Sequence, residues 1–228
     1  IQDQIGKSLL SQIGTTIMYD RRDNRMQPHS GYFVSVGGDF AGIGGDENYV
    51  RGKINGGYYI PLDDLTNSHN WTLAFRGGAG YLADWGSHGR HDVIDNFYLG
   101  GTNLRGFLDG GAGPRSVGNA THQSEDLIGG RFMYNASAQL NFPIPFLTDM
   151  GVGDRTFVDM GSVAGVRVKH LYTNPVTDGA NYTAISGDMI SPRVSAGAGF
   201  SWKSPFGLLN IDLGVPIRRS YNDRTQLL

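Results

Sequence analysis

Apolar and polar residues alternate with a period of two over long stretches of the chain, which is the pattern of β-strands with one buried face. The clearest stretch is Arg193–Lys203, where apolar side chains from Val194 to Trp202 occupy every second position. The pattern predicts eight strands, at Ser11–Asp20, Tyr32–Phe40, Tyr49–Ile60, Trp71–Tyr81, Arg131–Phe142, Thr156–Ala164, Arg193–Lys203 and Leu209–Ile217. No segment has a sustained helical period, so the sequence predicts an all-β, antiparallel fold.

Alternation alone fits a soluble β-sandwich as well as a transmembrane β-barrel, because both bury one face of each strand. The strand lengths favour the barrel: about ten residues at ~3.3 Å each, tilted by ~40°, span roughly 25 Å, the height of an outer-membrane apolar band. Aromatic residues stand at strand ends, as Trp71 and Tyr81 do. The polar positions hold Gly, Ser, Asn and Arg, which suits a wet lumen better than a soluble surface.

Composition narrows the function classes. The net charge of −2 and the lack of a Lys/Arg cluster argue against a nucleic-acid partner. The absence of cysteine excludes thiol chemistry and disulfides. No apolar run reaches about 18 residues, so no transmembrane helix is predicted. No signal peptide is visible either, and we expect the chain to be mature or cut from a longer protein.

One run of about forty residues, roughly His88 to Ile128, has no strand or helix period, and such runs in compact domains are usually functional or disordered. A disordered linker is polar and poor in aromatic residues. This run instead carries Phe97, Tyr98 and Phe107 near a central arginine, Arg105. We therefore expect an ordered loop that folds back onto the strands.

The centre of this loop, Gly100-Gly101-Thr102-Asn103-Leu104-Arg105-Gly106-Phe107, resembles the Gly-Gly-x-x-x-Arg-Gly-Phe/Tyr signature of the Omp85 superfamily. Phe157-Val158-Asp159-Met160-Gly161 is similar to the second motif of that family, Phe-x-Asp-x-Gly, on a later strand. Stretches at residues 19–31 and 202–213 resemble two further family hairpins. The four matches occur in the family's order over nearly the whole chain, which makes the resemblance specific.

The resemblance is closest to the BamA branch of barrel-assembly proteins in Gram-negative bacteria. It implies that residues 1–228 are the C-terminal part of a transmembrane β-barrel, with about eight of sixteen strands, in the order of strands eight to fifteen. The POTRA domains and the closing strand of the family have no counterpart in the sequence. It also implies an integral protein of the outer membrane, in contact with outer-membrane lipid.

The function that the resemblance implies is non-enzymatic: folding and inserting unfolded outer-membrane protein substrates, together with accessory lipoproteins of a BAM-like complex. No cofactor, metal or nucleic acid is implied. Four alternatives stay open at this point. They are a TamA-like or two-partner-secretion translocation subunit, a passive outer-membrane channel, a barrel-borne hydrolase and a soluble β-sandwich.

The resemblance also implies a site, with the loop tip in the lumen and Arg105 against Asp159 and Phe157. An arginine keeps its charge, so a buried Arg105 needs a partner, whereas the simpler alternative is an arginine that faces solvent. The implied loop residues are Gly100, Gly101, Leu104, Arg105, Gly106 and Phe107, and the implied strand residues are Phe157, Asp159 and Gly161. Among these, Gly106 and Gly161 would permit close approach.

Other candidate chemistry is weaker. His88 and His91, with Asp84 and Asp92 nearby, could hold a metal, but no second pair stands at ligand spacing, and a solvated loop is the simpler interpretation. The sequence contains no Gly-x-Ser-x-Gly elbow, the signature of one class of serine hydrolase. The sequence therefore predicts neither a catalytic residue nor a metal ligand.

Overall fold

In the computed structural model, eight long strands form one sheet in the order β1-β2-β3-β4-β6-β7-β9-β10, with antiparallel neighbours throughout. The structure describes residues 9–66, 71–86, 91–117, 126–144, 151–166, 184–204 and 207–227. The long strands are β1 (Gln12–Asp20), β2 (Gly31–Ala41), β3 (Tyr49–Pro61), β4 (Thr72–Asp84), β6 (Phe132–Phe142), β7 (Val152–Ala164), β9 (Arg193–Ser204) and β10 (Gly207–Arg218). All eight predicted strands are confirmed, although β7 begins earlier than predicted.

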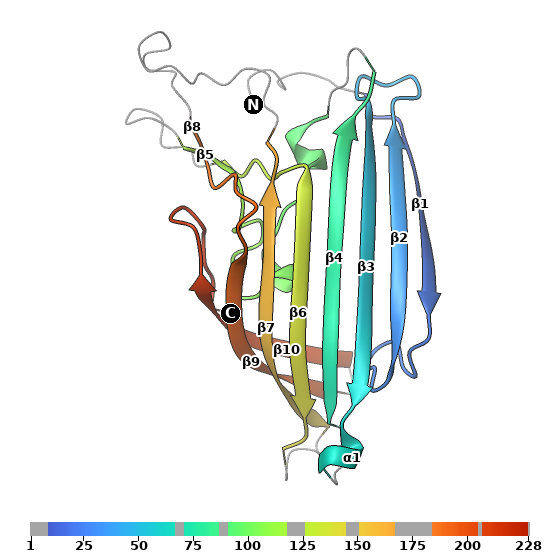
Figure 1. Ribbon diagram of the computed structural model, residues 1–228, viewed down its shortest axis with the longest axis vertical. Helices are drawn as coiled ribbons and strands as arrows, with labels where there is room; N and C mark the ends of the chain where they lie inside the picture. Colours follow the sequence, from blue (N-terminus) through green and yellow to red (C-terminus); the bar gives the residue numbers. More distant parts are fainter. Residues whose placement is uncertain are drawn as a thin grey trace.

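The connections contain shorter elements: β5 (Arg115–Val117), β8 (Ala184–Ser186), α1 (Asp63–Thr66), η2 (Val93–Asp95) and η3 (Gly101–Asn103). β5 and β8 pair with each other in a separate two-stranded sheet. Figure 1 shows the long strands side by side, with β9 and β10 curving behind the others like part of a barrel wall. Among the described residues β1 and β10 do not pair, so the sheet is open between them.

The apolar side chains of the long strands gather on one face of the sheet and stay exposed. On β10, for example, Leu209, Leu213 and Val215 are 52%, 53% and 55% exposed. A soluble sandwich would cover this face with a second layer, and the described residues form no such layer. An exposed apolar face opposite a polar one is the arrangement of a transmembrane β-barrel. In the same described ranges, no helix has the length and apolar character needed to cross a membrane.

The inner face is packed by the long loop between β4 and β6. Two clusters of buried side chains form there, and Met133 of β6 packs against both. The first cluster consists of Leu99, Leu104, Phe107, Ala112 and Val163. The second consists of Ala41, Tyr49, Leu82 and Phe97. The hydrophobic core of the described chain therefore lies between the loop and the concave side of the sheet.

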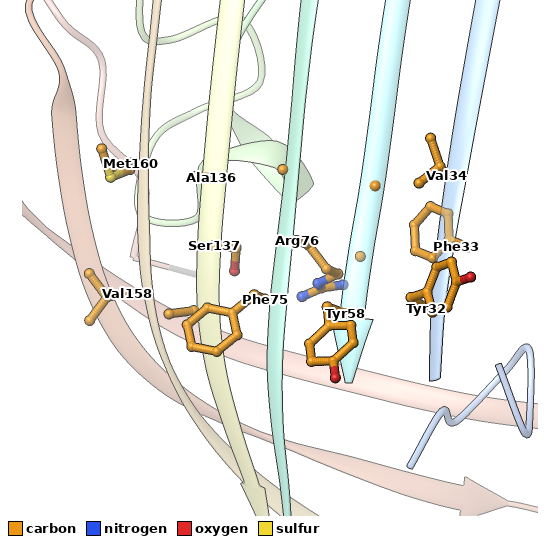
Figure 2. Close-up of a pocket in the computed structure, with 14 residues that line it drawn as sticks. Tyr32, Phe33, Val34, Tyr58, Phe75, Arg76, Ala136, Ser137, Val158 and Met160 are labelled. Carbon is orange, nitrogen blue, oxygen red and sulfur yellow. The ribbon is translucent and has the colours of Figure 1, made fainter. Parts of the chain in front are cut away.

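A shallow hollow of about 600 Å³ lies over the middle strands (Figure 2). Its base includes small residues at facing positions of neighbouring strands, Gly56, Gly77 and Ala136. Tyr58 and Phe75 form part of its rim, and both belong to the exposed apolar face. The hollow is thus a feature of the outward face, opposite to the long loop.

Candidate functional site: the tip of the long loop

The described part of the long loop folds onto itself inside the sheet. Its described parts are residues 91–117 and 126–130. Antiparallel bridges join Phe97 to Gly130 and Leu99 to Ala112. The Tyr98 hydroxyl donates a hydrogen bond of 2.7 Å to the Val93 carbonyl, and burial raises the pKa of this phenol. These contacts within the loop hold its backbone in place, although the loop contains only short helical and strand segments.

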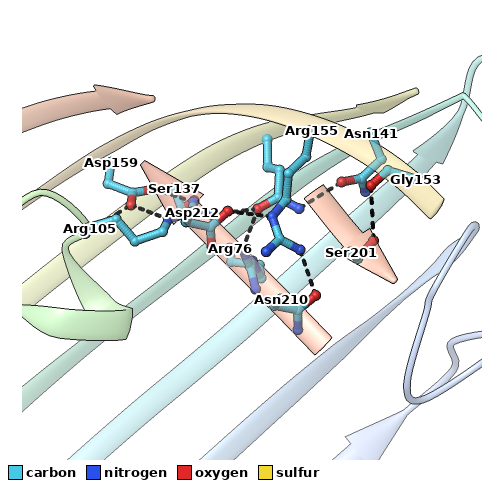
Figure 3. A network of polar contacts seen from close by, with 11 residues as sticks. Arg76, Arg105, Ser137, Asn141, Gly153, Arg155, Asp159, Ser201, Asn210 and Asp212 are labelled. Atoms are coloured by element: carbon cyan, nitrogen blue, oxygen red, sulfur yellow. Dashed lines mark hydrogen bonds and ion pairs between the residues drawn. The ribbon is translucent and has the colours of Figure 1, made fainter. Parts of the chain in front are cut away.

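Arg105 lies at the loop tip, and its guanidinium faces Asp159 on β7 (Figure 3). Its Nε–H donates to Oδ2 of Asp159 at 2.7 Å and its Nη2–H donates to Oδ1 at 2.8 Å, so the pair is bidentate. The backbone N–H of Arg105 also donates to Oδ2, at 3.2 Å. The two side chains are 11% and 2% exposed. Removing one partner of a pair this buried typically costs about 3–5 kcal/mol.

The ring of Phe157 completes the contact from the same face of β7. The Cζ atom of Arg105 lies 3.4 Å from the centroid of this ring. A planar guanidinium can stack on an aromatic face while its N–H groups point outward to hydrogen-bond acceptors. One short strand segment therefore supplies both the carboxylate and the ring that hold the loop tip.

Polar side chains of β6 and β10 add further contacts to Arg105. Its Nη1–H donates to Oε1 of Gln139 at 3.0 Å, and its Nη2–H donates to Oγ of Ser137 at 3.2 Å. On β10, Oδ2 of Asp212 lies 3.5 Å from Nη1, while Oδ1 of the same residue accepts a 2.6 Å bond from Nε of Arg155. Arg105 thus contacts three strands, β6, β7 and β10.

Three of these partners, Ser137, Gln139 and Asp212, were not singled out from the sequence. For Ser137 and Gln139 the signal is positional, whereas Asp212 lies on β10, two strands away from β7. Ser137 is the register partner of Asp159 across β6 and β7, and Gln139 is the partner of Phe157. Once the Phe-x-Asp-x-Gly strand is recognised, the polar positions of its neighbouring strands become the candidates for arginine partners.

Glycines allow the loop tip to touch the backbone of the sheet. Gly106 has a φ of +90°, and a Cβ there would lie 3.1 Å from the carbonyl carbon of Gly214 on β10. In the other direction, a Cβ on Gly214 would lie 2.6 Å from the Gly106 nitrogen. A Cβ on Gly161 would lie 2.7 Å from the Tyr134 oxygen and 3.0 Å from Cδ2 of Leu99. Gly214 is a contact that sequence reasoning missed.

The remaining motif residues shape the loop itself. Leu104 and Phe107, on either side of Arg105, are buried in the first core cluster. Gly100 and Gly101 both have positive φ, and the Gly101 N–H donates to the Phe107 carbonyl at 2.9 Å. The signature therefore builds a closed turn with apolar anchors that presents one cation at its tip.

The structure describes the first of the two hairpin stretches that resemble the family, residues 19–31, in full and the second, residues 202–213, in part. In the first, Arg22 pairs with Asp20 at 2.8 Å at the end of β1. In the second, Pro205 and Phe206 lie outside the described residues. The second hairpin contributes Asp212, which contacts Arg105, whereas no described contact joins the first hairpin to Arg105.

The discounted metal site receives no support. His91 hydrogen-bonds Asp84 through Nδ1, and His88 lies outside the described residues. Within the part of the chain that the structure describes, no group of three or more His, Asp or Glu side chains is placed to hold a metal ion.

Comparison with known proteins places the chain in a family. A family model described as the Omp85 superfamily domain matches residues 1–228. The chain is 29% identical over 226 residues to the outer membrane protein assembly factor BamA of Neorickettsia risticii, covering 99% of this chain and 27% of that protein. It is 25% identical over 225 residues to a SAM50-like protein of Schizosaccharomyces pombe, covering 96% of this chain and 43% of that protein. The human sorting and assembly machinery component 50 homolog is 26% identical over 155 residues, covering 66% and 30%.

A solved structure agrees with these relatives. BamA from Haemophilus ducreyi lacking POTRA domains 1–3 superimposes with a TM-score of 0.76 at 26% identity, covering 95% of this chain and 40% of that one. The chain spans 27% of the length of its Neorickettsia relative. The predicted resemblance, the barrel-type fold and the location in an outer membrane are confirmed. The chain belongs to the Omp85 superfamily of outer-membrane β-barrel proteins.

Proposed function

We propose that this chain is the C-terminal barrel region of a factor that folds and inserts β-barrel proteins into the outer membrane, and that Arg105 anchors its long loop inside the barrel. The first part is supported by one relative named as an outer membrane protein assembly factor and by another named as a component of a sorting and assembly machinery. The second part rests on the bidentate contact between Arg105 and Asp159. We call these two residues the loop anchor.

The assembly reaction that we propose needs no covalent chemistry. Strands of an incoming, unfolded outer-membrane protein pair with an exposed strand edge of the complete barrel, and main-chain hydrogen bonds supply the stabilisation. The factor acts without catalytic residues, metal or cofactor. Its partners are the unfolded substrate, the surrounding outer-membrane lipid and accessory lipoproteins of a BAM-like complex.

The loop anchor serves this function by fixing the shape of the sheet. Because Arg105 contacts β6, β7 and β10, the docked loop holds these strands at one separation. If the loop leaves, Asp159 stays behind with its carboxylate turned to the inner face and without its bidentate partner. The docked loop therefore favours one curvature of the barrel wall, which presents the strand edges in a constant geometry.

Substitution of Arg105 in the full-length protein tests the proposal. We expect Arg105→Ala to reduce the insertion of a β-barrel substrate at least about tenfold at equal protein level, since the lost interaction is worth several kcal/mol. Arg105→Lys should restore little, because an ammonium can neither form the bidentate pair nor stack on Phe157 in the same way. Insertion is measured by the heat-modifiable gel mobility of the substrate barrel.

Arg25→Ala is the matched control. Arg25 also faces a carboxylate, that of Asp20 at 3.4 Å, but its side chain is 82% exposed, so its removal should have little effect. Normal insertion by the Arg105→Ala protein would refute the role of the loop anchor. Export of the substrate instead of insertion would indicate a translocation subunit. Ion conductance without any effect on substrates would indicate a passive channel.

A further inference from the structure

The chain turns back onto the inner face of the sheet after β10, through residues 219–227, which we call the return segment. Three backbone hydrogen bonds join the return segment to the loop tip: Leu108 N–H to Arg224 O (3.0 Å), Arg224 N–H to Gly111 O (3.0 Å) and Gln226 N–H to Gly106 O (3.1 Å). The loop tip therefore lies between the sheet and the chain that leaves the sheet.

A second buried ion pair fixes the return segment. Nε of Arg193, the first residue of β9, donates to both carboxylate oxygens of Asp223, at 3.2 and 3.0 Å. The side chains are 3% and 1% exposed, so this pair is more buried than the loop anchor. The Ser220 N–H also donates to Oδ2 of Asp223, at 2.6 Å, and this bond closes the turn that carries the acid.

The rest of the Arg193 guanidinium binds elements on either side. Its Nη1–H donates to Oγ of Ser162 on β7 at 3.0 Å, and its Nη2–H donates to the Gly187 carbonyl at 3.0 Å. Gly187 directly follows β8, which pairs with β5 of the long loop. Arg193 is thus joined to the return segment, to the strand that carries Asp159, and to the two-stranded sheet at the other end of the loop.

We propose that Arg193 and Asp223 form a second anchor, which positions the return segment against the loop tip and couples the docking of the loop to the path of the chain after β10. This inference goes beyond the proposed function, because it concerns a different ion pair and a different segment. The inference does not depend on which substrate the protein handles.

The coupling follows from burial. Separating Arg193 from Asp223 would leave a charge in a site that excludes water, so partial release of the return segment is disfavoured, and the segment is either docked or free. The three backbone hydrogen bonds to the loop tip exist only when both segments are in place. Each segment therefore stabilises the docked state of the other, and the effect is reciprocal.

Amide hydrogen exchange of the full-length protein in lipid bilayers tests this coupling. Asp223→Asn keeps the size of the side chain and removes its charge. We expect exchange to be at least about tenfold faster in peptides covering residues 220–227, and also faster in peptides covering 105–112. Protection of β6 and β7 should stay unchanged, which shows that the sheet itself remains intact. In the reverse experiment, Arg105→Ala should accelerate exchange in residues 224–227.

Arg218→Ala is the control for this experiment. Arg218 stands at the end of β10 and donates an exposed hydrogen bond of 2.9 Å to Ser191, so its removal should leave both regions protected. Faster exchange in the return segment alone would overturn the coupling, and unchanged exchange in both regions would overturn the second anchor. If Asp223→Asn fails to insert, Arg193→Lys repeats the test with the charge retained. Hydrogen exchange is measured without any insertion assay. The second anchor can therefore be tested even if the proposed function proves wrong.

Discussion

Replacing Gly214 with alanine would place one methyl group where the loop tip meets β10. The new Cβ would lie 2.6 Å from the Gly106 nitrogen and 2.9 Å from the Arg105 carbonyl carbon. Both are backbone atoms, which cannot turn aside as a flexible side chain does. To reach the 3.4 Å of an ordinary contact, the loop tip must retreat by about 0.8 Å.

A retreat of this size acts on the hydrogen bonds of the tip. The Arg105 N–H to Asp159 bond (3.2 Å) would lengthen beyond about 3.5 Å, where a hydrogen bond is lost. A lost hydrogen bond contributes about 1 kcal/mol, and it is part of the total of about 1–3 kcal/mol that overpacking of a tight site costs. We expect Gly214→Ala to raise the population of undocked loop by about 5- to 150-fold.

A thiol in the loop reports this population. Residues 1–228 contain no cysteine, so Ala112→Cys, made with any cysteine elsewhere in the full-length protein replaced by serine, introduces a single reactive group at a loop position that is buried when the loop is docked. The rate of maleimide modification in the full-length protein then follows the undocked fraction. Gly52→Ala is the matched control, since a Cβ there meets no atom within 4 Å. Equal modification rates for Gly214→Ala and Gly52→Ala would refute the close-contact reasoning.

Three further substitutions probe the same site. Phe157→Leu keeps an apolar side chain but removes the stacked ring, and it should increase the same thiol modification by an amount equivalent to about 1–2 kcal/mol. Gly161→Val should displace the loop at Leu99 and lower the temperature at which the folded band of the protein itself is lost on a gel. An unchanged temperature would contradict the contact. Asp159→Asn should impair substrate insertion about as much as Arg105→Ala. The double variant should be no worse than either single one, whereas additive losses would show that the two residues act separately.

The strands could be predicted from sequence because each strand carries its own signal. On β10 every second residue faces outward and is apolar, so the faces of residues such as Leu213 and Gly214 can be assigned without knowledge of any neighbour. The loop carries no such period. Its position inside the sheet follows only from the family motifs, and these located Arg105 and Asp159 as an expected pair. The contact is present in the structure, while its function stays a proposal.

The contacts that sequence reasoning missed all depend on distant parts of the chain. Asp212 approaches Arg105 only because the sheet curves, and Gly214 meets Gly106 only because the loop lies on the backbone of β10. Asp223 reaches Arg193 only because the chain reverses after β10. None of these residues interrupts the local pattern around it, so register and curvature must be known before its role can be recognised.

The reach of Arg105 also has a geometric consequence for the size of the barrel. β7 and β10 are separated by β9, so in a flat sheet the two strands would lie about 9–10 Å apart, and Asp212 is level with Arg155 rather than with Asp159. One guanidinium nevertheless contacts Asp159 at 2.7 Å and Asp212 at 3.5 Å, because the wall bends around it. A wall of larger circumference would move these two acids apart until the arginine could touch only one. The contacts of the loop tip with both acids therefore match the curvature of this sheet.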